Sequence, residues 1–427
     1  MSFSNLGLAP ALERALADAG YTQPTDIQAQ AIPLAIKGQD LLGAAQTGTG
    51  KTAAFVLPIL QRLGTQPKEG RKVRALVLTP TRELCAQVLE SVRTYGKHAN
   101  FKSMAIFGGV SMNPQLEALR RGVDILVATP GRLIDHMDRR TVDLSQVEIL
   151  VLDEADRMLD MGFMPALKKV LSSLPKARQT MMFSATFSVE IKGLAAQFLR
   201  SPVEVQVARQ NSTAVSVTHI AHPVDNDRKK DALLEVLSQN SREQTLIFSR
   251  TKHGADKLAK SLVQAGLRTA VIHGNRSQAQ RTRALSDFKE GKVTVLVATD
   301  VAARGIDIIQ LPQVINYDLP MVAEDYIHRI GRTGRAGATG RALSLVTRED
   351  LVMFRDIEKL TKQSIKLQPL EGFEPLGTFN PVKAPPRQQQ QRAPRRNASA
   401  PSRTPHAAQH RSPRSPQGKS APRARKA

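Results

Sequence analysis

Short apolar segments recur along this chain at intervals of about one helix length, and this recurrence limits the fold more than any other feature. Continuous apolar strands separated by helical segments are typical of parallel sheets covered by helices on both faces. The series is interrupted once and then starts again, so the sequence predicts two α/β domains. The predicted strands are residues 40–45, 75–79, 103–107, 124–128, 149–153 and 180–184, then 245–249, 268–273, 294–299, 314–318 and 342–346.

The interruption at residues 201–218 is polar and lacks helical periodicity, so we place the domain boundary there. The first domain is predicted to span residues 1–207 and the second residues 218–377. From 378 to 427 the chain is rich in Pro, Ser, Arg and Gln, and no aromatic residue follows Phe379. Such a segment cannot bury enough apolar surface to offset its ordering entropy. We expect a disordered basic tail there.

The chain is strongly basic, with 61 Lys and Arg against 38 Asp and Glu and a formal net charge of +23. Twelve of the basic residues and none of the acidic ones follow residue 380, yet the preceding residues still have a basic excess. A polyanion is the natural partner of such a chain, RNA or DNA before a membrane. A charge that only keeps the chain soluble is the alternative.

Several classes of protein are disfavoured by composition. The single cysteine, Cys85, excludes a disulfide framework and a cysteine-based metal site, and we assign it to packing. No apolar run approaches the roughly 18 residues of a membrane-spanning helix. The first four residues lack the charged start of a secretory signal. A cytoplasmic setting is the expectation.

Residues 45–52, Ala-Gln-Thr-Gly-Thr-Gly-Lys-Thr, lie between a predicted strand and a predicted helix, as a phosphate-binding loop does. Its backbone N–H groups and the helix N-terminus would contact phosphate oxygens. Lys51 would reach the β- and γ-phosphates, and the Thr52 hydroxyl would bind Mg²⁺. Ala45 replaces the first glycine of the general pattern, and a plain Gly-Thr loop is the alternative. The predicted nucleotide contacts here are Gln46, Thr47, Gly48, Thr49, Gly50, Lys51 and Thr52.

A second motif supplies carboxylates. The apolar run at 149–152 ends in Asp153-Glu154-Ala155-Asp156, at the carboxyl end of a predicted parallel strand, where open α/β sheets bind their ligands. Asp153 would hold Mg²⁺, and Glu154 would orient or deprotonate the attacking water. The alternative is that these carboxylates only begin a helix.

The string Asp153-Glu154-Ala155-Asp156 resembles the name-giving motif of the DEAD-box ATP-dependent RNA helicases. About ten further motifs of that family follow in the same order over roughly residues 1–375. The start of the chain and its basic tail are most similar to the bacterial RhlE type. The resemblance implies two tandem RecA-like domains, ATP and Mg²⁺ as cofactors, and RNA as partner.

The resemblance also implies an adenine-reading segment at residues 20–28. Tyr21 would stack on adenine, Gln28 would hydrogen-bond the edge of the base, and Phe3 occupies the family's upstream aromatic position. In the second domain, the resemblance makes Asp307 a nucleotide contact.

Other motifs resemble the family's RNA-gripping loops and its coupling segments, which link hydrolysis to unwinding. The implied RNA contacts are Pro80, Thr81, Arg82, Gly109, Thr129, Gly131 and Arg132 in the first domain, and Arg281 and Thr299 in the second. The implied coupling residues are Asp156, Ser184, Thr186 and His328.

The strings that bind phosphate in the first domain contain no arginine to stabilise the transition state of phosphoryl transfer. Arg332 and Arg335, among glycines in the second domain, can supply it as arginine fingers. Hydrolysis would then require the two domains to close on each other. The alternative is a solvated charge run, which the interleaved glycines disfavour.

We therefore expect an RNA-dependent ATPase that unwinds short RNA duplexes locally or remodels RNA–protein particles. The basic tail would add a salt-dependent RNA anchor or dock ribosome-assembly or RNA-degradation proteins. A monomer is expected. An ATP-gated RNA clamp or chaperone, a DNA-translocating helicase and a catalytically inactive scaffold are the alternatives.

Overall fold

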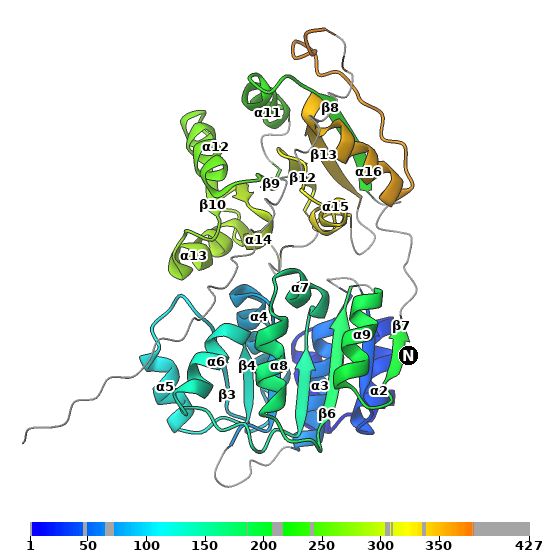
Figure 1. Ribbon diagram of the computed structural model, residues 1–427, viewed down its shortest axis with the longest axis vertical. Coiled ribbons are helices and arrows are strands. Elements are labelled where there is room, and N and C mark those ends of the chain that lie inside the picture. Colours follow the sequence, from blue (N-terminus) through cyan, green and yellow to red (C-terminus); the bar gives the residue numbers. More distant parts are fainter. Residues whose placement is uncertain are drawn as a thin grey trace, which may run out of the picture. The chain divides into compact units, whose positions relative to one another are not determined.

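The computed structural model describes residues 2–45, 49–64, 72–185, 187–206, 217–239, 243–303, 308, 311–334, 339–377 and 379. These residues form two separate sheets of parallel strands with helices packed on them (Figure 1). We call residues 2–206, built on the first sheet, lobe 1, and residues 217–379, built on the second, lobe 2. The two predicted α/β domains are both present.

Lobe 1 contains a seven-stranded sheet in the order β3-β4-β2-β5-β6-β1-β7. Its strands are β1 (Leu41–Ala44), β2 (Ala75–Leu78), β3 (Ser103–Ile106), β4 (Ile125–Ala128), β5 (Ile149–Leu152), β6 (Gln179–Ser184) and β7 (Val203–Gln206). Its helices are η1 (Phe3–Leu6), α1 (Pro10–Asp18), α2 (Asp26–Ile36), α3 (Lys51–Leu63), α4 (Arg82–Tyr95), α5 (Asn113–Arg120), α6 (Pro130–Asp138), α7 (Ala155–Asp160), α8 (Met164–Ser172) and α9 (Val189–Phe198).

Lobe 2 contains a six-stranded sheet in the order β10-β11-β9-β12-β13-β8. Its strands are β8 (Val217–Pro223), β9 (Thr245–Phe248), β10 (Thr269–Ile272), β11 (Val295–Ala298), β12 (Gln313–Asn316) and β13 (Gly340–Val346). Its helices are α11 (Lys229–Ser238), α12 (Lys252–Gln264), α13 (Gln278–Lys289), α14 (Asp300–Ala303), α15 (Ala323–Ile330), η2 (Arg348–Asp350) and α16 (Leu351–Thr361).

Alternate residues of each central strand enter cores on opposite faces of the sheet, as the two-residue period of a strand requires. In β5, Ile149 and Val151 join the core beneath α2, α3 and α4, whereas Leu150 and Leu152 join the core beneath α6, α8 and α9. Figure 1 shows these two groups of helices on opposite faces of the lobe 1 sheet. Burial on both faces explains why the strands read as unbroken apolar runs.

The structure corrects the interpretation of the boundary region. Residues 201–218 were predicted only as a polar interruption, but strands β7 and β8 begin within them. Both strands lie at an edge of their sheet. In β7 only Val205 is fully buried, while Glu204 and Gln206 are exposed. Edge strands need no continuous apolar run, so the apolar pattern that found the central strands missed these two.

The chain after α16 runs along the edge strand of lobe 2. Leu367 forms a parallel bridge with Ala221 of β8, and the Gln368 N–H donates to the Ala221 carbonyl at 2.8 Å. Leu370 then joins the lobe core. This segment covers one edge that would otherwise expose unpaired backbone groups. Apart from Phe379, which packs on a core cluster of lobe 2, the predicted disordered tail lies outside the described residues.

Within the described residues, no helix combines the length and the apolar character needed to cross a membrane.

Close packing at β1 predicts that one added methyl group at Gly43 lowers the stability of the fold. A Cβ at Gly43 would lie 2.7 Å from two ring carbons of Phe183, whose ring is fully buried against Phe55. We expect Gly43→Ala to lower the free energy of unfolding by about 1–3 kcal/mol, as overpacking does. Chemical denaturation would measure it. Gly193→Ala is the matched control, because a Cβ there meets no described atom within 4 Å. Equal stability of the two variants would contradict the prediction.

Candidate ATP site and RNA-facing loops

The phosphate loop is built as its sequence predicts in the part that the structure describes. Gly50 precedes α3 with φ of 93°, a conformation that favours glycine. Lys51 opens the helix with only 6% of its surface exposed. Its ammonium is buried and has no hydrogen-bond partner among the described residues. A buried unpaired cation at a helix N-terminus fits an anionic ligand. Gln46, Thr47 and Gly48 lie outside the described residues.

The carboxylates of the DEAD string follow β5. Asp153 is 2% exposed, and its Oδ1 atom accepts no hydrogen bond from the described residues. Burial raises the pKa of Asp153 to about 7, although the nearby charge of Lys51 acts in the opposite direction and lowers this pKa. Glu154 adopts a left-handed conformation, with φ and ψ both 53°, which is unusual for a residue other than glycine. Such backbone strain concentrates at functional sites.

Asp156 joins the carboxylate motif to the next strand. Its Oδ2 accepts from the Ala185 N–H at 2.9 Å, and its Oδ1 accepts from the Arg157 N–H at 2.9 Å. Ser184, at the end of β6, is fully buried. A shift at the carboxylates would therefore be transmitted to the Ser184–Ala185 segment. Thr186 lies outside the described residues.

The predicted adenine segment is tied to the phosphate loop. Gln28 accepts from the Thr25 N–H at 2.9 Å and donates from its amide nitrogen to the Gly50 carbonyl at 3.1 Å. Tyr21 is 46% exposed, and its ring meets the Tyr95 ring edge-on with centroids 5.9 Å apart. The link between Gln28 and Gly50 was not predicted from the sequence.

Phe3 differs from the other aromatic residue of this segment. Its ring is 5% exposed and belongs to the hydrophobic core of lobe 1. In this structure Phe3 packs into the core, and its contact with nucleotide stays a prediction.

The predicted RNA loops of lobe 1 follow β2, β3 and β4, and so lie at the same edge of the sheet. Thr81 caps α4 through the Leu84 N–H, and Pro80 is buried beside it. Thr129 precedes α6, and a Cβ at Gly131 would meet only open space.

Two arginines of these loops lie around the Gly108–Gly109 turn. A Cβ at Gly109 would fall 1.8 Å from the Arg82 guanidinium, so the absence of a side chain lets Arg82 approach. Arg132 donates to the Val110 carbonyl at 3.1 Å. Its Nε and Nη1 atoms are buried without a hydrogen bond to described residues, although Asp135 lies 3.6 Å from Nε. These unused donors suit a phosphate oxygen.

On the lobe 2 side, Thr299 follows β11 and is 9% exposed, and Arg281 makes a contact that the sequence did not predict. Its guanidinium pairs with Glu83 of lobe 1 at 2.8 Å, and the Gln278 amide also donates to Glu83 at 2.9 Å. The structure thus places Arg281 in an interlobe ion pair, and its contact with RNA stays a prediction. Glu83 was not predicted, although a carboxylate inside a basic RNA loop is itself a signal of an internal partner.

A second interlobe pair joins Arg157 to Asp325 at 3.0 Å, with both side chains largely buried. His328 lies close by. Burial and the neighbouring Arg157 charge lower the pKa of His328 to about 3, so the imidazole is neutral near pH 7. Together with Arg332, these residues line one small cavity. Arg332 is 7% exposed, and Arg335 and Asp307 lie outside the described residues.

Comparison with known proteins agrees with this arrangement. Residues 25–194 match the model of the DEAD/DEAH box helicase family, and residues 228–337 match the helicase conserved C-terminal domain. The chain is 42% identical to the DEAD-box ATP-dependent RNA helicase CshA of Bacillus subtilis over 365 residues, which cover 86% of this chain and 73% of CshA. The chain belongs to the DEAD-box family of ATP-dependent RNA helicases.

Other members of the DEAD-box family show the same likeness. DEAD-box ATP-dependent RNA helicase 30 of Arabidopsis thaliana is 44% identical over 359 residues, which cover 83% of this chain but only 61% of that protein. The solved chain of S. cerevisiae Dbp5 bound to RNA and ADP BeF3 is 33% identical, with a TM-score of 0.75, and the match covers 86% of this chain and 95% of that solved chain. DEAD-box helicases are RNA-dependent ATPases.

The buried state of His328 predicts acid sensitivity. Its pKa lies below that of an unfolded histidine, about 6.5, so the unfolded chain binds a proton that the folded chain refuses. This cost is absent above about pH 7 and grows as pH falls through 6.5. Between pH 8 and 5 we expect the free energy of unfolding of His328→Gln to fall less than that of the native chain, by about 1–2 kcal/mol at pH 5. Thermal unfolding at each pH would measure it. The exposed His253→Gln is the control, and parallel curves for all three would contradict the prediction.

The Glu83 contact predicts an effect on interlobe closure. Glu83→Gln removes the charge that faces Arg281 and leaves that guanidinium buried without its anion. Loss of one partner of a buried pair costs about 3–5 kcal/mol, so we expect the closed form to be depleted and the half-saturating RNA concentration to rise at least tenfold. Energy transfer between dyes on the two lobes would measure closure. Glu90→Gln, exposed on the same helix, is the matched control; an unchanged closed fraction in Glu83→Gln would contradict the expectation.

Proposed function

We propose that this chain uses ATP binding and hydrolysis to separate short RNA duplexes locally or to remodel RNA–protein particles. The division of charged groups between the lobes carries the proposal. Lys51 and Asp153 are buried in lobe 1, whereas Arg332 comes from lobe 2 and lies beside the Arg157–Asp325 pair. Hydrolysis then requires a closed arrangement, which RNA bound across both lobes would favour.

Each residue has a distinct task in this proposal. Lys51 neutralises phosphate charge, Glu154 orients the attacking water, and Arg332 stabilises the charge that develops in the transition state. We also propose Mg²⁺ as the metal, because the Thr52 hydroxyl and the Asp153 carboxylate are hard oxygen ligands and Asp153 Oδ1 is buried without another partner. The bound ion would neutralise phosphate oxygens.

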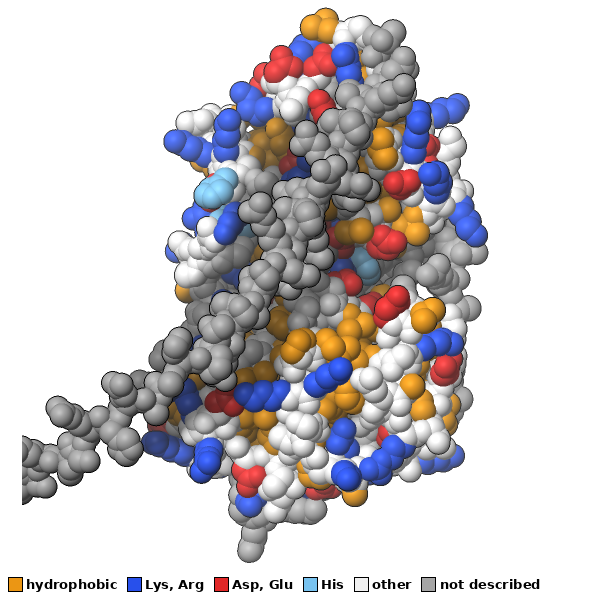
Figure 2. Space-filling model, in the orientation of Figure 1, with side chains coloured by type: hydrophobic (Ala, Val, Ile, Leu, Met, Phe, Trp, Pro, Cys, Tyr) orange, Lys and Arg blue, Asp and Glu red, His pale blue; other side chains and the backbone are white. Residues whose placement is uncertain are grey.

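RNA recognition is proposed to be largely independent of sequence. The loop residues Thr81, Arg82, Thr129 and Arg132 offer hydroxyl, backbone and guanidinium donors of the kind that bind phosphate rather than bases. Figure 2 shows Lys and Arg side chains spread over the visible face of both lobes rather than gathered in one patch. Diffuse positive charge attracts a polyanion without selecting its sequence.

Finer assignments rest on the sequence alone, on its resemblance to the family, its single cysteine and its charge. We propose the bacterial RhlE type, a cytoplasmic location and a monomer. We propose that the twelve basic residues after residue 380 add salt-dependent RNA affinity or dock partners in ribosome biogenesis or RNA degradation.

Steady-state ATP hydrolysis with no nucleic acid, with RNA and with DNA of the same sequence tests the proposal, alongside strand displacement from a short RNA duplex. We expect stimulation by RNA only, and displacement that needs ATP, with Lys51→Ala as the inactive blank. RNA retention without displacement would favour a clamp. Equal stimulation by DNA, or none by RNA, would contradict the assignment.

Arg332→Ala tests the proposed finger. We expect its RNA-stimulated kcat to fall by roughly 10³-fold or more, because such a finger acts only in the transition state. The KM for ATP should change little, since the finger acts on charge that develops only in the transition state. Arg355→Ala, at an exposed position of α16, is the control. A kcat in Arg332→Ala within a few fold of the native value would remove Arg332 from the mechanism.

A further inference from the structure

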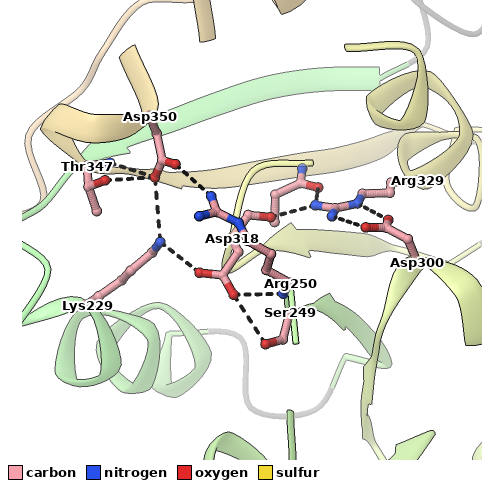
Figure 3. A network of polar contacts seen from close by, with 9 residues as sticks. Lys229, Ser249, Arg250, Asp300, Asp318, Arg329, Thr347 and Asp350 are labelled. Carbon is pink, nitrogen blue, oxygen red and sulfur yellow. Dashed lines mark hydrogen bonds and ion pairs between the residues drawn. The ribbon is translucent and has the colours of Figure 1, made fainter. Parts of the chain in front are cut away.

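Arg329 is a buried arginine that the proposed chemistry does not use. Its side chain is 2% exposed, yet it makes four hydrogen bonds (Figure 3). Nε and Nη2 donate to the two carboxylate oxygens of Asp300 at 2.6 and 2.7 Å. Nη1 donates to Asn316 Oδ1 at 3.0 Å and to the Asp318 carbonyl at 2.6 Å. The guanidinium also lies 4.8 Å from the centre of the Phe248 ring.

These partners lie at the carboxyl ends of three adjacent strands. Asp300 follows β11, Phe248 ends β9, and Asn316 and Asp318 lie at and just beyond the end of β12. Asp300 is also the residue directly after Thr299, the proposed RNA contact. Two backbone N–H groups of α14 donate to the Thr299 carbonyl, so Thr299 and Asp300 form one rigid turn. Arg329 therefore holds the turn that carries the RNA-facing hydroxyl.

Arg329 also contacts Arg332, the proposed arginine finger. It lies in the last turn of α15, and the Arg332 N–H donates to the Arg329 carbonyl at 3.2 Å. The Arg332 carbonyl in turn accepts from the Leu311 N–H at 3.0 Å. A movement of the Arg329 backbone must therefore move the start of the Arg332 turn.

The far side of this network is fixed by other charges. The Asp318 carboxylate accepts from Lys229 at 3.1 Å, from the Ser249 hydroxyl at 3.2 Å and from the Arg250 N–H at 2.9 Å (Figure 3). Lys229 and Arg250 both also reach Asp350, beyond the end of β13. Asp318 is therefore held by groups other than Arg329 on that side.

We propose that Arg329 is a positioning residue that couples RNA contact at Thr299 to the placement of Arg332, through its two-pronged bond to Asp300. The inference rests on the proposed function. A guanidinium is planar and donates two parallel hydrogen bonds to one carboxylate, so it fixes direction as well as distance. A lysine ammonium keeps the charge but not that geometry.

Arg329→Lys and Asp300→Asn test the proposal in the full chain, with Arg341→Lys as the matched control. Arg341 also pairs with a carboxylate, Glu243, but on β13, near the opposite end of the sheet. The readout is kcat with saturating RNA divided by kcat without RNA. We expect Arg329→Lys to lower this ratio by about 10- to 100-fold, as a misplaced catalytic group does. The KM for ATP and the half-stimulating RNA concentration should change by less than about threefold. Arg341→Lys should keep the native ratio.

A purely structural role predicts a different result, in which the melting temperature falls and both rates fall together while the ratio is unchanged. That result in Arg329→Lys or in Asp300→Asn would overturn the proposal. If Arg329→Lys does not fold, Asp300→Asn decides alone, because it keeps the size of the side chain and removes only the charge. A native chain that RNA does not stimulate would contradict the proposed function, and this inference with it. An RNA-stimulated native chain with unchanged ratios in the variants would contradict this inference alone.

Discussion

Parallel pairing of the strands is the constraint on which the rest of this structure depends. Strands that all run in one direction present all their carboxyl ends at one edge of the sheet, and the loops that follow them must meet there. In lobe 1 this brings together the segments after β1, β2, β3, β4 and β5, although they are spread over more than a hundred residues of sequence. In lobe 2 the same rule gathers the segments after β9, β11, β12 and β13.

Buried charge pairs then determine how these edges are arranged. Glu83 with Arg281, Arg157 with Asp325, and Arg329 with Asp300 all include a guanidinium that is at most 9% exposed. Removing such groups from water costs free energy, and only a well-aligned partner offsets that cost. These pairs therefore select one relative orientation more than they add stability. Two of them join the lobes, and the third joins two functional turns within lobe 2.

The sequence predicted features that depend on neighbouring residues, such as central strands and contiguous motifs. It missed contacts between residues that are far apart in the chain. Every central strand was found because burial on both faces leaves an unbroken apolar run, and the phosphate loop was found because its residues are contiguous. Strands β7 and β8 were missed because an edge strand is buried on fewer sides. The carboxylate of Glu83 signals that it has some partner, but nothing local identifies Arg281 as that partner, or pairs Arg157 with Asp325, since each pairing depends on two folded sheets. The core packing of Phe3 was also not predicted, because its position in a motif says nothing of the side chains around it.

The hydrogen bond between Gln28 and the Gly50 carbonyl has a consequence for how the enzyme would select its nucleotide. An amide has two N–H groups and an oxygen with two lone pairs, and Gln28 uses one of each on Thr25 and Gly50. The remaining donor and acceptor match the proposed adenine contact. The side chain proposed to contact the base therefore also supports the loop proposed to bind the phosphates. A nucleotide with the wrong base would then be penalised in turnover as well as in affinity, because an ill-matched base disturbs the phosphate loop itself.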